Sequence, residues 1–368
     1  MSGLQQTLKK FNLPRYHLIL LGVAAVLSAL LLYLPFLFKD ATVLTRFWDG
    51  PNYIYVAKTL YQIPADHPFV PYKTTPAYFA CHLPFYPLAI KLFSFMTYPV
   101  AMLFTTVLFA VLATLTFYQL LRESGAVANP FWSALISLFL PARWLIYHSV
   151  GATEAPFLFL ICLSMLFYLR KQYTWAFLLA GLAGITRITG ILLGLVYLIM
   201  LIRDKAWKRI PLLVIIGLPL LATFTFYHFQ YGDFMAYFSW NNKLIHSRPL
   251  DIFFNYAGSG NAHAAELYLG LYLLYGLGVL MLWRFPLFFT YGAVFYVFNL
   301  FVFHEDLSRY MLPLAPFALV IGYDEIIKTR AFKIASLGLI AMAYVYAWGV
   351  LPHNLVADWV YANLIKVL

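Results

Sequence analysis

Long apolar runs follow one another from residue 16 to residue 350, and short polar or basic segments separate them. A helix needs about 20 consecutive apolar residues to cross a bilayer. The runs are continuous, whereas the strands of a membrane β-barrel alternate between apolar and polar residues. The pattern therefore predicts an all-α, polytopic membrane protein. The expected spans are residues 16–38, 98–121, 130–147, 154–169, 175–202 (as two helices), 211–229, 266–283, 286–303, 311–321 and 331–350.

The segment 175–202 has two possible interpretations. One straight helix would place the basic clusters at residues 170–171 and 203–209 on opposite sides of the membrane. Two short helices that meet near residues 185–190 place both clusters in the cytoplasm, as the positive-inside bias favours. We prefer the two helices, which makes about eleven spans, with the N-terminus inside and the C-terminus outside.

The segment 39–96 is too polar for the bilayer core, yet it is rich in Tyr, Phe and Pro. This composition is typical of short amphipathic helices that lie at the membrane interface. We expect it to form a first extracytoplasmic loop. The pattern contains no internal repeat and no appended soluble domain, so residues 1–368 are expected to form one membrane domain.

The composition supports the same class of protein. Hydrophobic residues make up 63% of the chain and charged residues 11%, against about 25% charged residues in soluble domains. The net charge of +11 comes from basic residues that interrupt apolar runs, so it indicates membrane topology rather than nucleic-acid binding. The basic segment 1–15 precedes an apolar run too long for a signal peptide, which favours a retained first span.

The rare polar residues gather on the predicted outer side, and Asp49 is the first candidate for chemistry. It lies beside Trp48, shortly after the first span. Partial desolvation raises the pKa of a carboxylate in general and suits it to act as a general base. An interfacial loop with an incidental acid is an equally good interpretation from spacing alone.

Further candidates occur at helix ends. His82 precedes the sequence Pro84-Phe85-Tyr86-Pro87 at the start of an apolar helix. Glu154 follows Thr153 in a first helical turn, where the helix dipole favours an acid. Arg187 stands amid apolar residues, where a charge is costly unless it has a partner or faces water. It could hold a phosphate, or it could form a structural ion pair with Glu154.

The short segment from His304 to Tyr310 is dense in ionisable groups. Arg309 begins the next predicted span, where a cation opposes the helix dipole, so we expect an anionic partner for it. Arg143, inside the third predicted span, must either reach outward or pair internally. The sequence has no Walker loop, no dinucleotide-binding fingerprint, no Asp-x-Asp and no zinc spacing. We therefore expect no cofactor and no metal site.

Taken in order, these motifs resemble those of a known family. Trp48-Asp49 follows the first span, Pro84-Phe85-Tyr86-Pro87 opens a helix, Glu154 heads another, and Thr186-Arg187-x-x-Gly190 follows. The arrangement resembles the GT-C superfamily of membrane glycosyltransferases and is most similar to the GPI mannosyltransferase 2 family and its prokaryotic relatives. The similarity covers residues 47–193 and extends more loosely to Arg309-Tyr310. Gly50 stands where the family usually has Ala or Ser.

The resemblance implies a GT-C fold and the inverting transfer of a sugar, most similar to mannose transfer, from a polyprenyl- or dolichyl-phosphate donor. The acceptor would be a hydroxyl of a glycan, glycolipid or protein on the extracytoplasmic side. The implied membrane is the plasma membrane of a prokaryote or the ER membrane of a eukaryote. Asp49 matches the family's catalytic base, and the expected substrate-binding residues are Trp48, His82, Tyr86, Glu154, Arg187, His304, Arg309 and Tyr310.

Two other functions fit the same features. A transporter or flippase of a lipid-linked or small solute would also use buried charges and broken helices. The absence of a two-fold repeat and the placement of polar groups on one side speak against it. A non-catalytic membrane scaffold is the second alternative, and the presence of both Asp49 and Arg187 speaks against that one.

Overall fold

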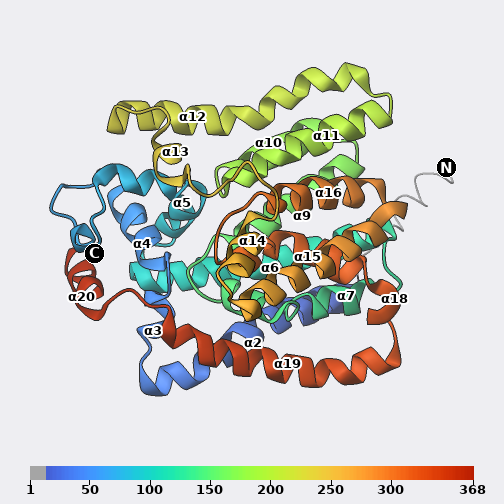
Figure 1. Cartoon of the computed structure of the whole chain (residues 1–368), viewed down its shortest axis with the longest axis horizontal. Helices are drawn as coiled ribbons and strands as arrows, with labels where there is room; N and C mark the ends of the chain where they lie inside the picture. The colour runs from blue at the N-terminus through green and yellow to red at the C-terminus, as the bar shows by residue number, and fades with distance from the viewer. Residues whose placement is uncertain (1–13) are drawn as a thin grey trace.

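The computed structural model describes residues 14–368, so the basic residues Lys9 and Lys10 lie outside the described part of the chain. Long helices run side by side and form one bundle (Figure 1). Within the described residues the only β-type pairings are two isolated bridges, which confirms the all-α prediction. The main bundle helices are α2 (Arg15–Lys39), α6 (Tyr98–Ser124), α7 (Pro130–Ile136), α8 (Ala142–Tyr147), α9 (Glu154–Leu169), α10 (Tyr173–Gly184), α11 (Leu192–Arg203), α12 (Val214–Tyr231), α15 (Ala262–Met281), α16 (Pro286–Leu300) and α19 (Arg330–Val350).

Local sequence signals set several helix boundaries. The Asn129 side chain accepts the backbone N–H of Trp132 at the start of α7, and Thr329 accepts that of Phe332 at the start of α19. These bonds satisfy donors that a helix N-terminus leaves without an intrahelical partner. Gly125 ends α6 and Gly232 ends α12, both with positive φ, a backbone conformation that glycine adopts without steric cost.

Five helical stretches in residues 14–368 are long and apolar enough to cross a bilayer. They are Arg15–Lys39, Tyr98–Ser124, Trp207–Tyr231, Ala262–Arg284 and Arg330–His353. Many of their large side chains face outward, among them Phe38 (83% exposed), Phe229 (82%) and Leu337 (72%). Exposing this much apolar surface to water is costly, whereas contact with the apolar chains of lipids is favourable. Four further apolar helices, Glu154–Leu169, Tyr173–Gly184, Ile188–Arg203 and Pro286–Leu300, are shorter.

Two predicted spans are irregular. The third, 130–147, is broken into α7 and α8 by residues 137–141. Pro141 explains the break, since proline has no backbone N–H and disfavours helical geometry in the residue before it. The segment 311–321 forms a 3₁₀ turn, η6 (Leu312–Leu314), and a π-helix, η7 (Pro316–Ile321), and its side chains are buried in the bundle.

The chain reverses between α10 and α11, in agreement with the two short helices predicted for residues 175–202. A 3₁₀ turn, η3 (Ile188–Ile191), follows Arg187, and the Tyr197 ring lies 5.4 Å from that of Phe177. Gly190 lies so close to α10 that a Cβ atom there would be 2.4 Å from the backbone of Ala183. The two helices are therefore antiparallel, and Arg187 occupies the apex of the hairpin.

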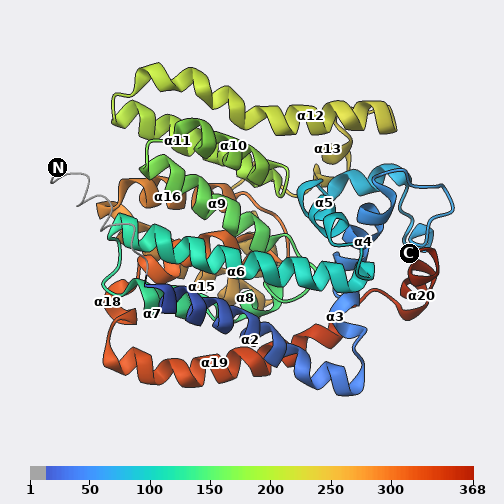
Figure 2. The same ribbon diagram turned by 180° about the vertical axis from the view of Figure 1, so that it is seen from behind.

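The segment 39–96 gathers at one end of the bundle. It forms short helices, which are α3 (Val43–Arg46), α4 (Gly50–Thr59), η1 (Val70–Tyr72), η2 (Pro76–Cys81) and α5 (Phe85–Leu92). The C-terminal helix α20 (Asp358–Val367) lies at the same end (Figure 2). Phe47 pairs with Leu355, and Arg46 donates to the Val356 carbonyl at 2.9 Å. The C-terminal segment thus holds the start of the first loop in place.

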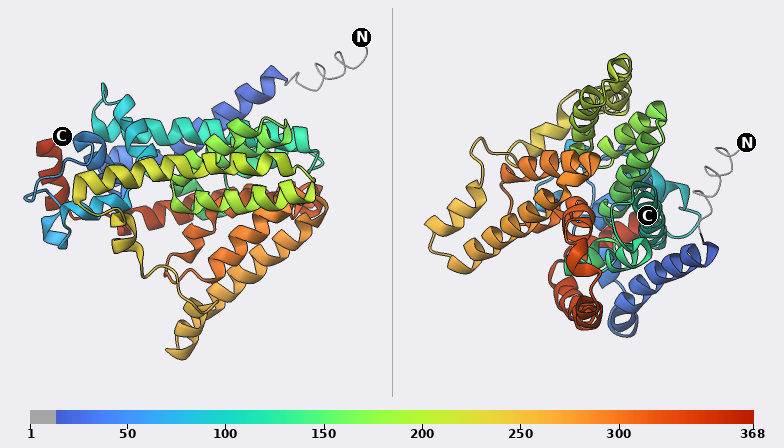
Figure 3. Two further views of the ribbon diagram at one scale, coloured as in Figure 1. Left: turned by 90° about the horizontal axis from the view of Figure 1, so that it is seen from above. Right: turned by 90° about the vertical axis from the view of Figure 1, so that its right-hand side faces the viewer.

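Basic residues mark the opposite end of the bundle. Arg170 follows α9, Arg203 ends α11 and Arg330 begins α19. Figure 1 shows these helix ends on the side away from α4 and α20, and Figure 3 shows the bundle from above and from its end. The charge asymmetry of the sequence is therefore an asymmetry between the two ends of the fold.

The hairpin contact predicts a large effect of Gly190→Ala. The added methyl group would overlap backbone atoms of α10 that no side-chain rotation can move, and overpacking typically costs about 1–3 kcal/mol. We expect a midpoint of thermal unfolding several degrees lower in detergent. Gly217→Ala in α12 is the matched control, since no atom lies within 4 Å of the added carbon. Equal midpoints for the two variants would show that the α10–α11 contact is not tight.

Candidate functional site

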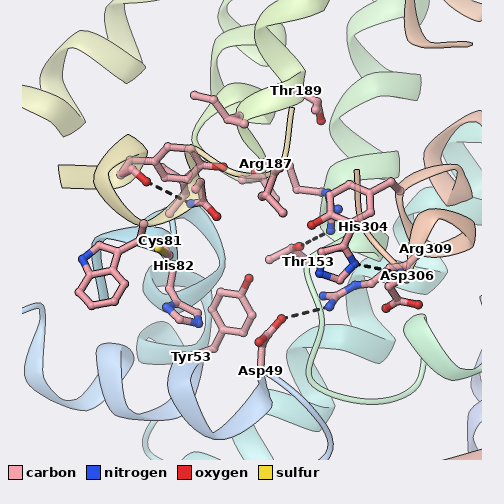
Figure 4. Close-up of a pocket in the computed structure, with 18 of the residues that line it drawn as sticks. Asp49, Tyr53, Cys81, His82, Thr153, Arg187, Thr189, His304, Asp306 and Arg309 are labelled. Carbon is pink, nitrogen blue, oxygen red and sulfur yellow. Dashed lines mark hydrogen bonds and ion pairs between the residues drawn. The ribbon is translucent and has the colours of Figure 1, made fainter. Parts of the chain in front are cut away.

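A cavity of about 310 Å³ lies where the short helices of the first loop meet the bundle. Seven of the expected site residues line it. They are Trp48, Asp49, His82, Arg187, His304, Arg309 and Tyr310. Residues from distant parts of the sequence thus share one space, and Figure 4 shows how Asp49, Arg187 and Arg309 surround it.

Asp49 is presented to this cavity by a tight local structure. Trp48 has φ of 43°, and α4 begins directly after Asp49. The Asp49 side chain does not cap α4 but points across to Arg309. Behind it, Gly50 packs on Gly151, and a Cβ atom on Gly151 would lie 3.0 Å from the Gly50 Cα. This close approach brings the first loop next to the start of α9.

Glu154 binds both arginines of the site. Its Oε1 accepts hydrogen bonds from Arg309 Nε at 2.6 Å and from Arg187 Nη1 at 2.7 Å. Its side chain is 0% exposed, whereas Asp49 is 29% exposed. Arg309 Nη1 also donates to Asp49 Oδ2 at 3.1 Å, so one guanidinium joins both carboxylates. The anionic partners expected for Arg309 are therefore residues of the protein itself.

The charges within this group balance. Two arginines face two carboxylates, and Arg187 Nη1 also donates to Thr153 Oγ1 at 3.1 Å. The Arg309 guanidinium lies 4.8 Å from the centre of the Tyr147 ring, and that of Arg187 lies 5.8 Å from the Tyr310 ring. Buried ions are tolerated where they are paired and hydrogen-bonded in this way. Asp49 is the more exposed of the two acids, which makes it the one that a ligand can reach.

A second ion pair holds the segment that carries Arg309. Arg143 pairs with Asp306, and it donates to Ser308 Oγ at 2.5 Å. The backbone N–H of Asp306 donates to His304 Nδ1 at 2.9 Å. Arg143 therefore pairs internally, and it fixes α17 (Leu307–Tyr310) against α8 so that Arg309 reaches Glu154.

The other side of the cavity is aromatic and uncharged. His82 is 4% exposed, and its burial lowers its pKa to about 4, partly opposed by the nearby Asp49 carboxylate. Burial also raises the pKa of the Cys81 thiol to about 12. Both groups are neutral near pH 7, so Cys81 is not a thiolate nucleophile there. The carboxylate and guanidinium side chains that line the cavity, Asp49, Arg187, Asp306 and Arg309, all take part in ion pairs.

Two expected substrate-binding residues lie behind the cavity wall. Tyr86 is 0% exposed, and its hydroxyl bonds Thr106 Oγ1 at 2.5 Å. Glu154 contacts the cavity only through the arginines that it binds. Several other lining residues were not predicted from the sequence; they are Tyr53, Tyr78, Cys81, Thr153, Tyr237, Trp240, Asn241 and Asp306. Tyr237, Trp240 and Asn241 could have been found as polar and aromatic residues in α13 (Ala236–Asn241), next to an apolar span.

Within the described residues, no group of three or more His, Cys, Asp or Glu side chains could hold a metal ion. Comparison with known proteins adds no family to this description. No protein-family model matches the chain, and a search of curated proteins finds no match.

Because Glu154 is buried and Asp49 is partly exposed, we predict that loss of the Glu154 carboxylate destabilises the protein more than loss of the Asp49 carboxylate. Removing one partner of a buried ion pair typically costs about 3–5 kcal/mol, because it leaves an uncompensated charge. We therefore expect Glu154→Gln to lower the unfolding midpoint in detergent far more than Asp49→Asn does. A midpoint for Glu154→Gln equal to that of wild type would mean that Glu154 does not organise the arginines.

The neutral state of His82 predicts a pH effect on stability. Its pKa falls from 6.5 in the unfolded chain to about 4 in the folded protein, so the unfolded chain binds more protons between these values. Stability should therefore decline as the pH falls from about 6.5 towards 4. Unfolding midpoints measured across this range should fall less steeply for His82→Gln than for wild type. Identical slopes would show that His82 takes up its proton equally in both states.

Proposed function

We propose that the protein is an integral membrane glycosyltransferase of the GT-C type, with about eleven spans in all. It transfers a sugar, most consistent with mannose, from a polyprenyl- or dolichyl-phosphate donor to an acceptor hydroxyl, with inversion at the anomeric carbon. The observation that supports this most is the joint presence of an accessible acid, Asp49, and two arginines at one cavity. The site lies at the end of the bundle opposite the basic clusters, which indicates the extracytoplasmic side.

Asp49 is suited to the role of general base. It is accessible from the cavity, and its carboxylate is bound by a single arginine. Glu154 is fully buried and does not line the cavity, so an acceptor hydroxyl in the cavity does not reach it. As the acceptor oxygen attacks C1 of the donor sugar, its proton passes to Asp49.

The arginines are suited to stabilise the leaving phosphate. Before reaction, Arg187 and Arg309 balance Glu154 and Asp49. Once Asp49 is protonated, this group of four side chains carries one net positive charge. That charge appears as the C1–O bond breaks and the phosphate becomes more negative, and a cation in a poorly solvated site stabilises it strongly.

The surroundings of the cavity are compatible with a lipid-linked donor. The end of α12 and the residues that follow it carry outward-facing aromatic side chains, including Phe226, Phe229 and Phe234. Tyr237 and Trp240, a few residues further on, line the cavity itself. A polyprenyl chain in the bilayer could therefore lie along this helix while its phosphate enters the cavity.

The test is transfer by purified protein from polyprenyl-phosphate mannose and dolichyl-phosphate mannose, followed by mass analysis of the products. A general base contributes about 10²–10⁴-fold, so we expect Asp49→Asn to reduce transfer at least 100-fold while the protein still folds. Asp66→Asn is the matched control, since Asp66 is an exposed acid of the same loop outside this cavity.

Full turnover by Asp49→Asn would remove Asp49 from the mechanism. Movement of an intact lipid-linked sugar across proteoliposomes, without cleavage of the donor, would favour the transporter or flippase instead. A chain that does neither would be a scaffold.

A further inference from the structure

A second cavity, of about 350 Å³, lies at the basic end of the bundle, away from Asp49. It is formed where α6, α9 and α11 end and where α10 and α16 begin. Its lining combines charged side chains, among them Lys171 and Arg203, with the aromatic rings of Tyr168 and Phe288. The proposed transfer reaction makes no use of this cavity.

The charged residues at this cavity leave one positive charge uncompensated. Glu123 is bound by Arg170, whose Nη2 and Nε donate to its two carboxylate oxygens at 2.6 and 3.1 Å. Asp204 pairs with Arg203 at 3.3 Å. Lys171 lines the cavity and has no ion pair among residues 14–368. A ligand with one negative charge would therefore complete the balance.

The start of α16 adds hydrogen-bond donors to the same cavity. Leu287 and Phe288 are the second and third residues of this helix, and both line the cavity. The first four N–H groups of a helix have no acceptor within it. The backbone bond from Phe289 to the Phe285 carbonyl is the one that opens the α16 ladder. N–H groups in this position, together with the helix dipole, favour a bound anion.

The carbonyl groups at the ends of α9 and α11 are already occupied. Both helices end in a Schellman turn, in which two backbone N–H groups beyond the helix bind carbonyls of its last turn. Lys171 holds the left-handed position of the first turn, with φ of 61°, and Lys205 that of the second, with φ of 54°. Glycine is the usual residue there. The two lysines have equivalent backbone positions, but only Lys171 lines the cavity.

A buried hydroxyl marks where a ligand would bind. Tyr168 is 5% exposed and lines the cavity, yet its hydroxyl has no hydrogen-bond partner among the described residues. Asp204 lies close enough to interact with it electrostatically and is itself paired with Arg203. The Tyr197 ring stacks on the Tyr168 ring at 4.8 Å and fixes its direction. A buried hydroxyl without a partner is costly, and an acceptor atom of a ligand would remove that cost.

The surroundings of the cavity place it at the depth of lipid headgroups. Trp175 near the start of α10, Trp207 between α11 and α12, and Trp283 just before α16 are all more than half exposed. Tryptophan side chains concentrate at the interface between membrane and water. Leu169 lines the cavity and is also exposed, so the cavity borders the apolar surface of the bundle.

We propose that this cavity binds the phosphate diester of an anionic phospholipid from the leaflet at the basic end of the bundle. The phosphate accepts hydrogen bonds from Lys171, from the Tyr168 hydroxyl and from the N–H groups at the start of α16. A free phosphate shares this chemistry, but the exposed Trp and Leu side chains favour a lipid. The inference is independent of the proposed glycosyltransferase function, and no covalent bond is made or broken.

The test is a titration of the purified full-length protein in detergent with palmitoyl-oleoyl phosphatidylglycerol, in which native mass spectrometry measures the lipid-bound fraction. Phosphatidylcholine with the same acyl chains is the control lipid, since its headgroup has no net charge. We expect a Kd about tenfold lower for phosphatidylglycerol, because basic groups near the surface select anionic headgroups. A large excess of inorganic phosphate should not displace the lipid.

Three variants test the named groups. Lys171→Gly removes the charge at a backbone position that glycine prefers, so the fold is retained, and Kd for phosphatidylglycerol should rise about fivefold. Lys205→Gly is the matched control, since it removes the same charge from the equivalent turn outside the cavity, and it should leave Kd nearly unchanged. Tyr168→Phe should raise Kd about tenfold without lowering the unfolding midpoint of the lipid-free protein, because the hydroxyl that it removes has no partner.

Four outcomes would overturn the proposal. Equal Kd values for the two lipids would remove the selectivity for an anion, and an unchanged Kd for Lys171→Gly would remove the cavity from the interaction. Equal losses for Lys171→Gly and Lys205→Gly would reduce it to a diffuse attraction to the basic end. Displacement of the lipid by inorganic phosphate would make free phosphate the ligand.

Discussion

The buried carboxylate of Glu154 is the constraint on which the site depends. A charge with no exposed surface is tolerated only when oppositely charged and hydrogen-bonding groups surround it. Oε1 of Glu154 meets this condition by binding Arg187 from the α10–α11 hairpin and Arg309 from α17. Arg309 then reaches Asp49 of the first loop. Four segments of the chain are therefore joined through Glu154 and Arg309, and three of them place a charged side chain at the cavity.

Packing of small residues allows these segments to approach. Gly50 and Gly151 bring the first loop against the start of α9, and Gly190 brings the apex of the hairpin against α10. The resulting cavity has two chemically different sides, one with paired ions and one with aromatic rings and phenolic hydroxyls.

The sequence predicts the elements of the fold better than it predicts their contacts. Apolar runs predict the helical class, because a helix that spans a membrane needs a long apolar segment. The turn near Arg187 follows instead from the basic clusters on both sides of residues 175–202, which one straight helix would place on opposite sides of the membrane. The break in the third predicted span was not predicted, although Pro141 is a residue that interrupts helices. Asp49, Glu154, Arg187 and Arg309 were found because charges amid apolar residues need partners. Their pairing was only partly foreseen, since Arg309 and Glu154 are 155 positions apart. The α13 residues that line the cavity, Tyr237, Trp240 and Asn241, were not predicted, because aromatic residues are common throughout this chain.

The most direct test of the central claim is an experimental structure of the protein with a polyprenyl-phosphate sugar bound. We expect the phosphate to lie against Arg187 and Arg309, and Asp49 to face C1 of the sugar across a gap large enough for one hydroxyl. Glu154 should remain buried behind both arginines. A phosphate bound away from these arginines, or an Asp49 turned out of the cavity in that complex, would contradict it.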